Sequence, residues 1–130
     1  GNRTVSGVTG VTKVGQTYSD TEVDRISIDT IKAVSSKPHG IFGVDMAFDI
    51  NGIPNPTEIN ISRFFTTILF FTEAGINLPS IFAELGLTGK TSAKIGSMSP
   101  LQDGLMWMRG MDVVPMLCNE QSIKEGIIFL

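Results

Sequence analysis

Two acidic residues flank a predicted tight turn in the stretch GVDMAFDINGIPNPTEIN, residues 43–60. An Asn-Gly pair within Ile50–Ile53 is typical of a two-residue type I′ hairpin turn, which fixes the register of both strands. In that register Asp45 lies directly opposite Glu58 in a non-hydrogen-bonded pair, with Cβ atoms about 4.5–5.5 Å apart. Asn60 follows Glu58 by two positions and therefore shares its face of the hairpin.

These side chains could hold a hard divalent cation. Like charges opposite each other in a ladder are destabilising, so a positive charge should neutralise Asp45 and Glu58. Mg²⁺ or Mn²⁺ suits two carboxylates and an amide oxygen, and Mg²⁺ takes phosphate oxygens for further ligands. The pattern indicates a nucleotide phosphate site. The alternative is an ordinary solvent-facing hairpin whose acids pair with lysine or arginine.

The prolines of the return strand support this predicted register. Pro54 and Pro56 fall at non-hydrogen-bonded positions, where a missing N–H costs no bond between the strands. Their expected partners are Asp49 and Ala47. The apolar pairs also agree: Ile59 opposite Val44, and Ile61 opposite Phe42.

The surrounding pattern predicts an α+β fold, an antiparallel sheet with helices packed on one face, in a single domain over residues 1–130. Helices are expected at Asp20–Val34, with a Ser19 and Glu22 capping box, at Arg63–Gly75, and from Pro79, at N1, through Leu85. Strands are expected within Thr4–Tyr18, at Ile41–Ile50 and Ile53–Ile61, and within Leu105–Cys118, broken at Gly110 and Pro115. Residues 86–104 are polar and rich in Gly and Ser, which predicts a loop.

The hairpin and its flanking elements resemble the second half of an ATP-grasp domain, closest to the carbamoyl phosphate synthetase-like branch. The resemblance lies in an acidic residue on one strand, a short hairpin and a Glu-x-Asn motif, here Asp45 and the EIN of Glu58 and Asn60. A preceding helix and a following AGINLP turn match the family's order of elements. The resemblance covers roughly Thr4 to Leu85.

Membership of that family would make the chain part of an ATP-dependent carboxylate–amine ligase. Asp45, Glu58 and Asn60 would hold one or two Mg²⁺ ions against the phosphates of ATP, and a small-molecule carboxylate would be activated as an acylphosphate. Arg63 would be the catalytic residue that orients a phosphate or the acylphosphate. The family often has its arginine just after the asparagine, whereas here it comes three residues later.

The composition limits the partners and the compartment. The net charge is −3 and the ten Lys and Arg are scattered, which argues against a nucleic-acid surface. One cysteine, Cys118, makes no internal disulfide, so a reducing, cytoplasmic compartment is expected, with the thiol buried and inert. No apolar run approaches about 18 residues, so no membrane span is expected.

The resemblance also implies missing parts. The family's adenine hinge, phosphate-binding lysine and glycine-rich lid lie upstream of the matching segment, so this chain is expected to be a portion of a longer enzyme, inactive alone, with exposed apolar surface that could form a homo-oligomer. The rival hypothesis is a non-catalytic binding or interaction module that retains the fold.

Overall fold

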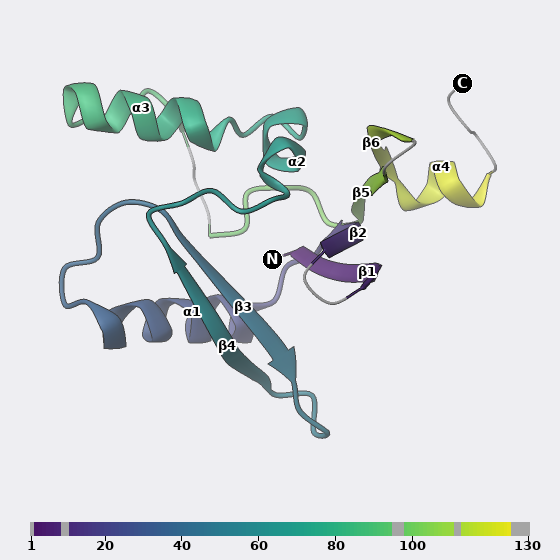
Figure 1. Cartoon of the computed structure of the whole chain (residues 1–130), viewed down its shortest axis with the longest axis horizontal. Helices are drawn as coiled ribbons and strands as arrows, with labels where there is room; N and C mark the ends of the chain where they lie inside the picture. The colour runs from purple at the N-terminus through teal and green to yellow at the C-terminus, as the bar shows by residue number, and fades with distance from the viewer. Residues whose placement is uncertain (1, 9–10, 95–97, 111–112, 126–130) are drawn as a thin grey trace.

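The computed structural model describes residues 2–8, 11–94, 98–110 and 113–125 as a mixed α+β fold of antiparallel strands and helices, which confirms the predicted class (Figure 1). The strands are β1 (Asn2–Val8), β2 (Val11–Thr17), β3 (Phe42–Phe48), β4 (Pro54–Ile61), β5 (Leu105–Gly110) and β6 (Val113–Asn119). The helices are α1 (Thr21–Val34), α2 (Ile68–Glu73), α3 (Leu78–Thr88) and α4 (Glu120–Lys124).

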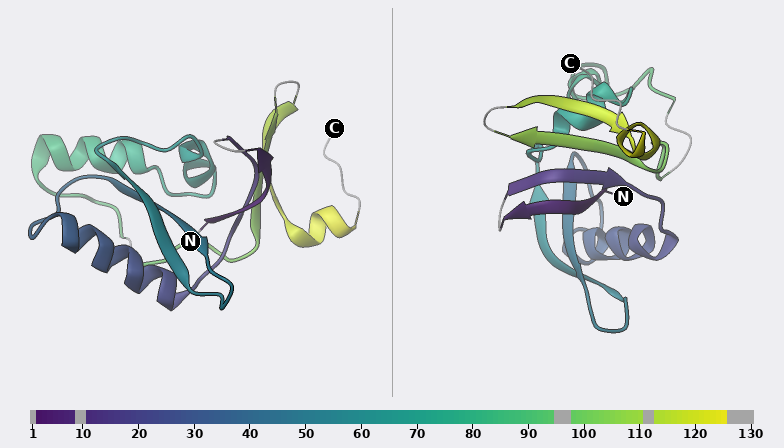
Figure 2. Two further views of the ribbon diagram at one scale, coloured as in Figure 1. Left: turned by 60° about the horizontal axis from the view of Figure 1, so that its bottom comes forward. Right: turned by 90° about the vertical axis from the view of Figure 1, so that its right-hand side faces the viewer.

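The strands form two antiparallel sheets: a four-stranded sheet in the order β1-β2-β5-β6 and the two-stranded hairpin β3-β4. The larger sheet joins the two ends of the chain through β2 and β5, where Gly15 is opposite Trp107. Thr17 fixes the start of β5, because its hydroxyl donates to the Gln102 carbonyl at 2.6 Å and accepts from the Leu105 amide at 2.9 Å. The right panel of Figure 2 shows these four strands side by side.

The predicted break at Pro115 is wrong, because β6 runs through it. The strand accommodates a residue without an N–H since β6 is an edge strand and its pairing with β5 shifts register between Met108 and Gly110. The predicted break after Gly110 is confirmed.

The core of the described residues is small. Phe70 on α2 is fully buried and stacks on Trp107 of β5, with ring centroids 5.9 Å apart and planes 7° apart. The chain exposes 9017 Å² of surface, whereas a compact folded monomer of its 14.0 kDa mass exposes about 6700 Å². Much surface that a domain of this size would normally cover is therefore open.

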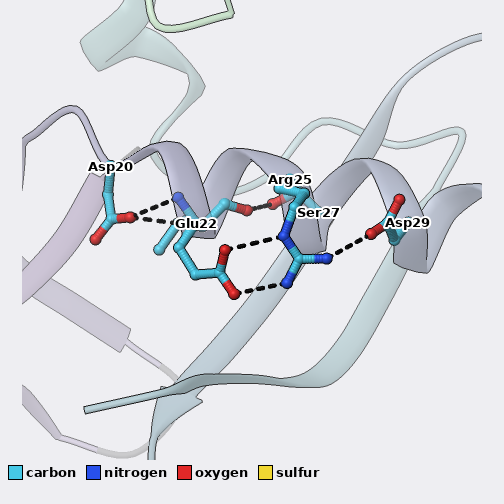
Figure 3. A network of polar contacts seen from close by, with 6 residues as sticks. Asp20, Glu22, Arg25, Ser27 and Asp29 are labelled. Carbon is cyan, nitrogen blue, oxygen red and sulfur yellow. Dashed lines mark hydrogen bonds and ion pairs between the residues drawn. The ribbon is translucent and has the colours of Figure 1, made fainter.

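Helix α1 packs mainly against β4 of the hairpin. It begins where Asp20 accepts hydrogen bonds from the amides of Glu22 and Val23 at 2.9 and 3.1 Å. The predicted Ser19 capping box is therefore wrong: the next residue supplies the cap. The Glu22 carboxylate is instead held by Arg25, which also reaches Asp29 (Figure 3).

On the other side of the hairpin lie α2 and α3 (Figure 2, left panel). The predicted helix from Arg63 begins only at Ile68, because residues 63–67 turn back toward the hairpin. Helix α3 begins after Asn77, whose side chain caps the Ser80 amide at 2.9 Å. It continues three residues past the expected end at Leu85, because Gly89, at φ 70°, provides the left-handed cap.

Candidate functional site

The turn between β3 and β4 differs from the predicted two-residue turn. The Asp49 amide donates to the Ile53 carbonyl at 2.9 Å, and the Gly52 amide donates to the Asp49 carbonyl at 3.0 Å, so the loop has three residues. Gly52 has φ 78°, the left-handed conformation that such a loop requires at its last position. The Asp49 carboxylate also accepts from the amides of Asn51 and Ile53, at 2.9 and 2.8 Å. These bonds favour the longer loop.

A β-bulge at Thr57 compensates for the longer loop. Between the tip and the bulge, Pro54 pairs with Phe48 and Pro56 with Met46, one position away from the predicted partners Asp49 and Ala47. Thr57 is then the extra residue, and its hydroxyl donates to the Asp45 carbonyl at 3.1 Å.

The base of the hairpin keeps the predicted register. Asp45 lies directly opposite Glu58, as expected, and the two isoleucine pairs are also confirmed. The pair's place in the ladder is different. At the two ends of the hairpin, the Asp49 N–H donates to the Ile53 carbonyl and the Ser62 N–H donates to the Ile41 carbonyl. Hydrogen-bonded and non-hydrogen-bonded pairs alternate along the strands, so Asp45 and Glu58 form a hydrogen-bonded pair. Their Cα atoms are therefore about 5.5 Å apart, not about 4.5 Å.

The four predicted site residues meet on one face of the hairpin. The Asn60 amide nitrogen donates to Asp45 Oδ2 at 3.4 Å, and Arg63 Nε donates to Asn60 Oδ1 at 2.8 Å. A second guanidinium nitrogen of Arg63 bonds the same Asn60 oxygen and lies 3.5 Å from Glu58 Oε1. An internal cation thus partly neutralises the carboxylate pair, which is the role the sequence assigned to a metal or to a lysine or arginine.

The backbone at Ser62 places Arg63 over this face. Ser62 has φ 59°, which is uncommon for a residue other than glycine, and it ends β4 by reversing the chain. Gly43 lies on the same side of the hairpin, where a Cβ would make ordinary contacts with the Phe65 ring at 3.6 Å and with Asn60 Cβ at 3.8 Å. Sequence reasoning missed the role of Ser62, because no glycine or Asn-Gly pair marks a left-handed residue at this position.

The ion pair at the site is weak. The Arg63 side chain is 70% exposed and that of Glu58 58% exposed. Exposed pairs of this kind contribute about 0–1 kcal/mol. The ion pair between Arg63 and Glu58 therefore adds little to the stability of the hairpin.

The oxygen donors on this face are of the types that a hard cation prefers. Asp45 and Glu58 provide carboxylate oxygens and Asn60 an amide oxygen, the ligand types that Mg²⁺ and Mn²⁺ prefer. Across residues 2–8, 11–94, 98–110 and 113–125, no group of three or more His, Cys, Asp or Glu side chains could hold a metal. A bound ion would need the Asn60 oxygen and ligand atoms from outside these side chains.

A separate cavity of about 400 Å³ lies along α3 and does not involve the hairpin. Its lining includes Asn77, Glu84 and Lys94. Glu84 accepts hydrogen bonds from the Ser92 amide at 3.0 Å and the Thr91 hydroxyl at 2.9 Å, and these bonds lower the pKa of Glu84. The carboxylate is thus used to hold the loop after α3.

Two other sequence expectations concern the remainder of the chain. Cys118 is buried, as expected, and burial raises the pKa of its thiol. In the part of the chain that the structure describes, every helix is too short or too polar to cross a membrane.

Compared with known proteins, the chain matches no protein-family model, no curated protein and no solved structure.

Proposed function

We propose that this chain forms part of the magnesium–ATP site of an ATP-grasp ligase. The supporting observation is the group made by Asp45 opposite Glu58, with Asn60 and Arg63 on the same face. A Glu-x-Asn strand paired with an acidic strand is the arrangement that the resemblance implies for this activity.

In this proposal Asp45, Glu58 and Asn60 hold Mg²⁺ or Mn²⁺. The ion would neutralise charge on the ATP phosphates and align them for transfer. An oxygen of the substrate carboxylate attacks the γ-phosphorus, and the bond from that phosphorus to the bridging oxygen breaks, so ADP leaves. An amine or similar nucleophile then attacks the acylphosphate carbon, and inorganic phosphate leaves.

Arg63 has two positions in this proposal. Without a bound ion its guanidinium occupies Asn60 Oδ1, the oxygen that a metal would use. An ion on that oxygen would compete with Arg63, whose exposed side chain would then be available to bind a phosphate or the acylphosphate in bidentate fashion. Binding of the ion and release of the arginine would thereby be coupled.

The remaining parts of such a site, an adenine pocket, a phosphate-binding lysine and a lid, would come from outside this segment. We therefore expect the 130-residue chain alone to hydrolyse ATP no faster than background. Because fold-level resemblance does not choose a substrate, the proposal extends to the class of carboxylate activation only.

Paramagnetic broadening by Mn²⁺ tests the site directly. With Mn²⁺ added to the chain, the amide NMR signals of Asp45, Glu58 and Asn60 should broaden first. In Glu58→Gln, at least ten times more Mn²⁺ should be needed for the same broadening, because a charged ligand is lost. The matched control is Glu73→Gln, which removes one exposed acid outside the site. Equal broadening in wild type and Glu58→Gln would remove the basis of the proposal.

The alternative is a non-catalytic interaction module, and the open surface favours it. The chain exposes about 2300 Å² more than a compact monomer of its mass, and several large apolar side chains are exposed. The most exposed of these are Ile50 (100%), Leu87 (87%) and Val114 (84%). In this case Arg63 is a permanent partner of Glu58, and Mn²⁺ broadens no hairpin signal selectively.

A further inference from the structure

Strand β3 has one free edge. Along an antiparallel strand, successive residues turn their N–H and C=O groups alternately toward and away from the partner. The bonds of Asp49 to Ile53 and of Ile41 to Ser62 direct the odd-numbered residues of β3 toward β4. The outward-facing groups belong to Phe42, Val44, Met46 and Phe48. Within the described residues, β3 pairs with β4 alone.

The other edge of the hairpin is closed by proline. Pro54 and Pro56 occupy outward-facing positions of β4 and have no N–H to offer, and the bulge at Thr57 follows them directly. Prolines and bulges are the usual protection of an edge strand against pairing. Strand β3 contains neither over Phe42–Phe48. The hairpin is thus protected on one side only.

We propose that the outer edge of β3 binds an extended, antiparallel segment of another polypeptide that carries a basic side chain opposite Asp45. The four outward N–H and C=O groups supply the pairing, as in strand-addition complexes. Relative to such a segment, Asp45 lies in a non-hydrogen-bonded pair, where opposite side chains come closest.

The charge distribution selects a basic side chain. Asp45 is exposed, and its carboxylate receives a single hydrogen bond, from Asn60 at 3.4 Å, among the described side chains. Arg63 pairs with Glu58 instead. A lysine or arginine opposite Asp45 would complete a row in which each carboxylate has its own cation.

The same charge disfavours a second copy of this chain. Pairing β3 with itself in antiparallel fashion through at least three outward residues allows three registers. In one register the two Asp45 residues are directly opposite, and in the other two they are diagonal neighbours about 7–8 Å apart. Each register therefore brings two like charges together.

The apolar face of β3 defines the other positions of the bound segment. Phe48 is 52% exposed, and Val44 and Met46 are half-buried on the same face. Residues of the segment that pair with these three extend the same face, so they should be apolar and β-branched. The segment therefore alternates apolar residues with polar ones, and the central polar residue is basic.

Amide hydrogen exchange gives a direct test in metal-free buffer. The probe is an end-capped peptide, Val-Thr-Val-Lys-Val-Thr-Val, whose valines pair with the outward residues and whose lysine faces Asp45. In the free chain the inward amides of Gly43, Asp45 and Ala47 should exchange slowly and the outward amides quickly. Saturating peptide should slow exchange of the Val44 and Met46 amides at least tenfold.

Two control peptides separate the contributions. Replacing the lysine by glutamate should weaken binding by at least about threefold, because an opposite charge becomes a like charge. Methylating the valine amides should abolish binding, because the bonds to β3 are lost. Equal affinity for the lysine and glutamate peptides would overturn the charge assignment, and unchanged exchange of Val44 and Met46 would overturn the edge itself.

A pair of chain variants completes the test. Met46→Pro removes one outward N–H at a position opposite Pro56, and it should weaken peptide binding at least tenfold. Met46→Thr loses the same apolar side chain but keeps the N–H, and it should bind the peptide within about threefold of wild type. Unchanged Trp107 fluorescence confirms that both variants keep the larger sheet. If the outward amides are instead protected without peptide, increasingly at high protein concentration, a second copy occupies the edge and the proposed partner is wrong.

Discussion

Replacing Asp45 by asparagine should stabilise the fold. Asp45 and Glu58 lie directly opposite each other, and such like-charge pairs cost roughly 0.2–1 kcal/mol. The substitution removes this repulsion. The asparagine oxygen still accepts the bond from Asn60, which is 3.4 Å long in the wild type. The free energy of unfolding should therefore rise by about 0.2–1 kcal/mol.

Glu58→Gln should behave differently, although it removes the same repulsion. It also removes the 3.5 Å ion pair between Glu58 and Arg63. Because both side chains are exposed, this ion pair contributes only about 0–1 kcal/mol to stability. Gain and loss nearly cancel, so the free energy of unfolding should stay close to that of wild type. The two variants should thus differ in stability while both lose Mn²⁺ affinity.

Thermal unfolding followed by far-UV circular dichroism measures the difference. For a chain of 130 residues the expected rise in Tm for Asp45→Asn is about 1–4 °C at low salt. In 1 M NaCl, where the Debye length is about 3 Å, the rise should largely disappear. A lower Tm for Asp45→Asn, or a rise that persists in 1 M salt, would refute the reasoning, because Asp45 would then stabilise the fold by some other contact.

Three further predictions follow from the core, the thiol and the loop after α3. Phe70→Ala should lower the free energy of unfolding by about 3–5 kcal/mol. Phe70→Leu keeps an apolar side chain but loses the ring contacts with Trp107 and Phe71, so it should cost about 1–2 kcal/mol. Urea titrations followed by Trp107 fluorescence measure both, and a similar loss for both would contradict a contribution from the ring contacts. Cys118 should react with a thiol reagent at least tenfold faster in urea than in the native state, since burial raises the pKa of the thiol, and equal rates would show an accessible sulfur. Hydrogen bonds from Ser92 lower the pKa of Glu84 from its ordinary 4.5, so this contact should hold at neutral pH and be lost as the pH falls through that lowered value. The NMR chemical shift of the Ser92 amide reports the contact, and Glu84→Gln should remove its pH dependence.

Local patterns predicted the elements well where one signal dominated. Helix α1 begins within one residue of the predicted start and ends at the predicted Val34, because an amphipathic repeat dominates the segment, although its cap is Asp20 and not Ser19. Asp45 lies opposite Glu58 as the two-residue turn predicts, although the loop has three residues, because the unpaired Thr57 restores the register at the base of the hairpin. Both depend on contacts close in sequence.

Predictions failed where several local solutions compete. The Asn51-Gly52 pair suits a two-residue turn, but the Asp49 carboxylate binds two loop amides and favours three residues. The start of α2 was placed too early because the apolar run after Arg63 is helical by composition, whereas the left-handed Ser62 directs it back to the hairpin. Such competition is decided by side chain–backbone bonds that no periodicity reveals.

The bulge at Thr57 gives the hairpin an unusual tolerance to changes in length. Deleting one residue from the middle of a strand normally moves every later side chain to the opposite face. Thr57 has no partner residue in β3, so its deletion would leave Asp45 opposite Glu58 and Met46 opposite Pro56. Related chains could therefore gain or lose this single position during evolution without disturbing the acidic pair, and an alignment gap there would say nothing against a shared site.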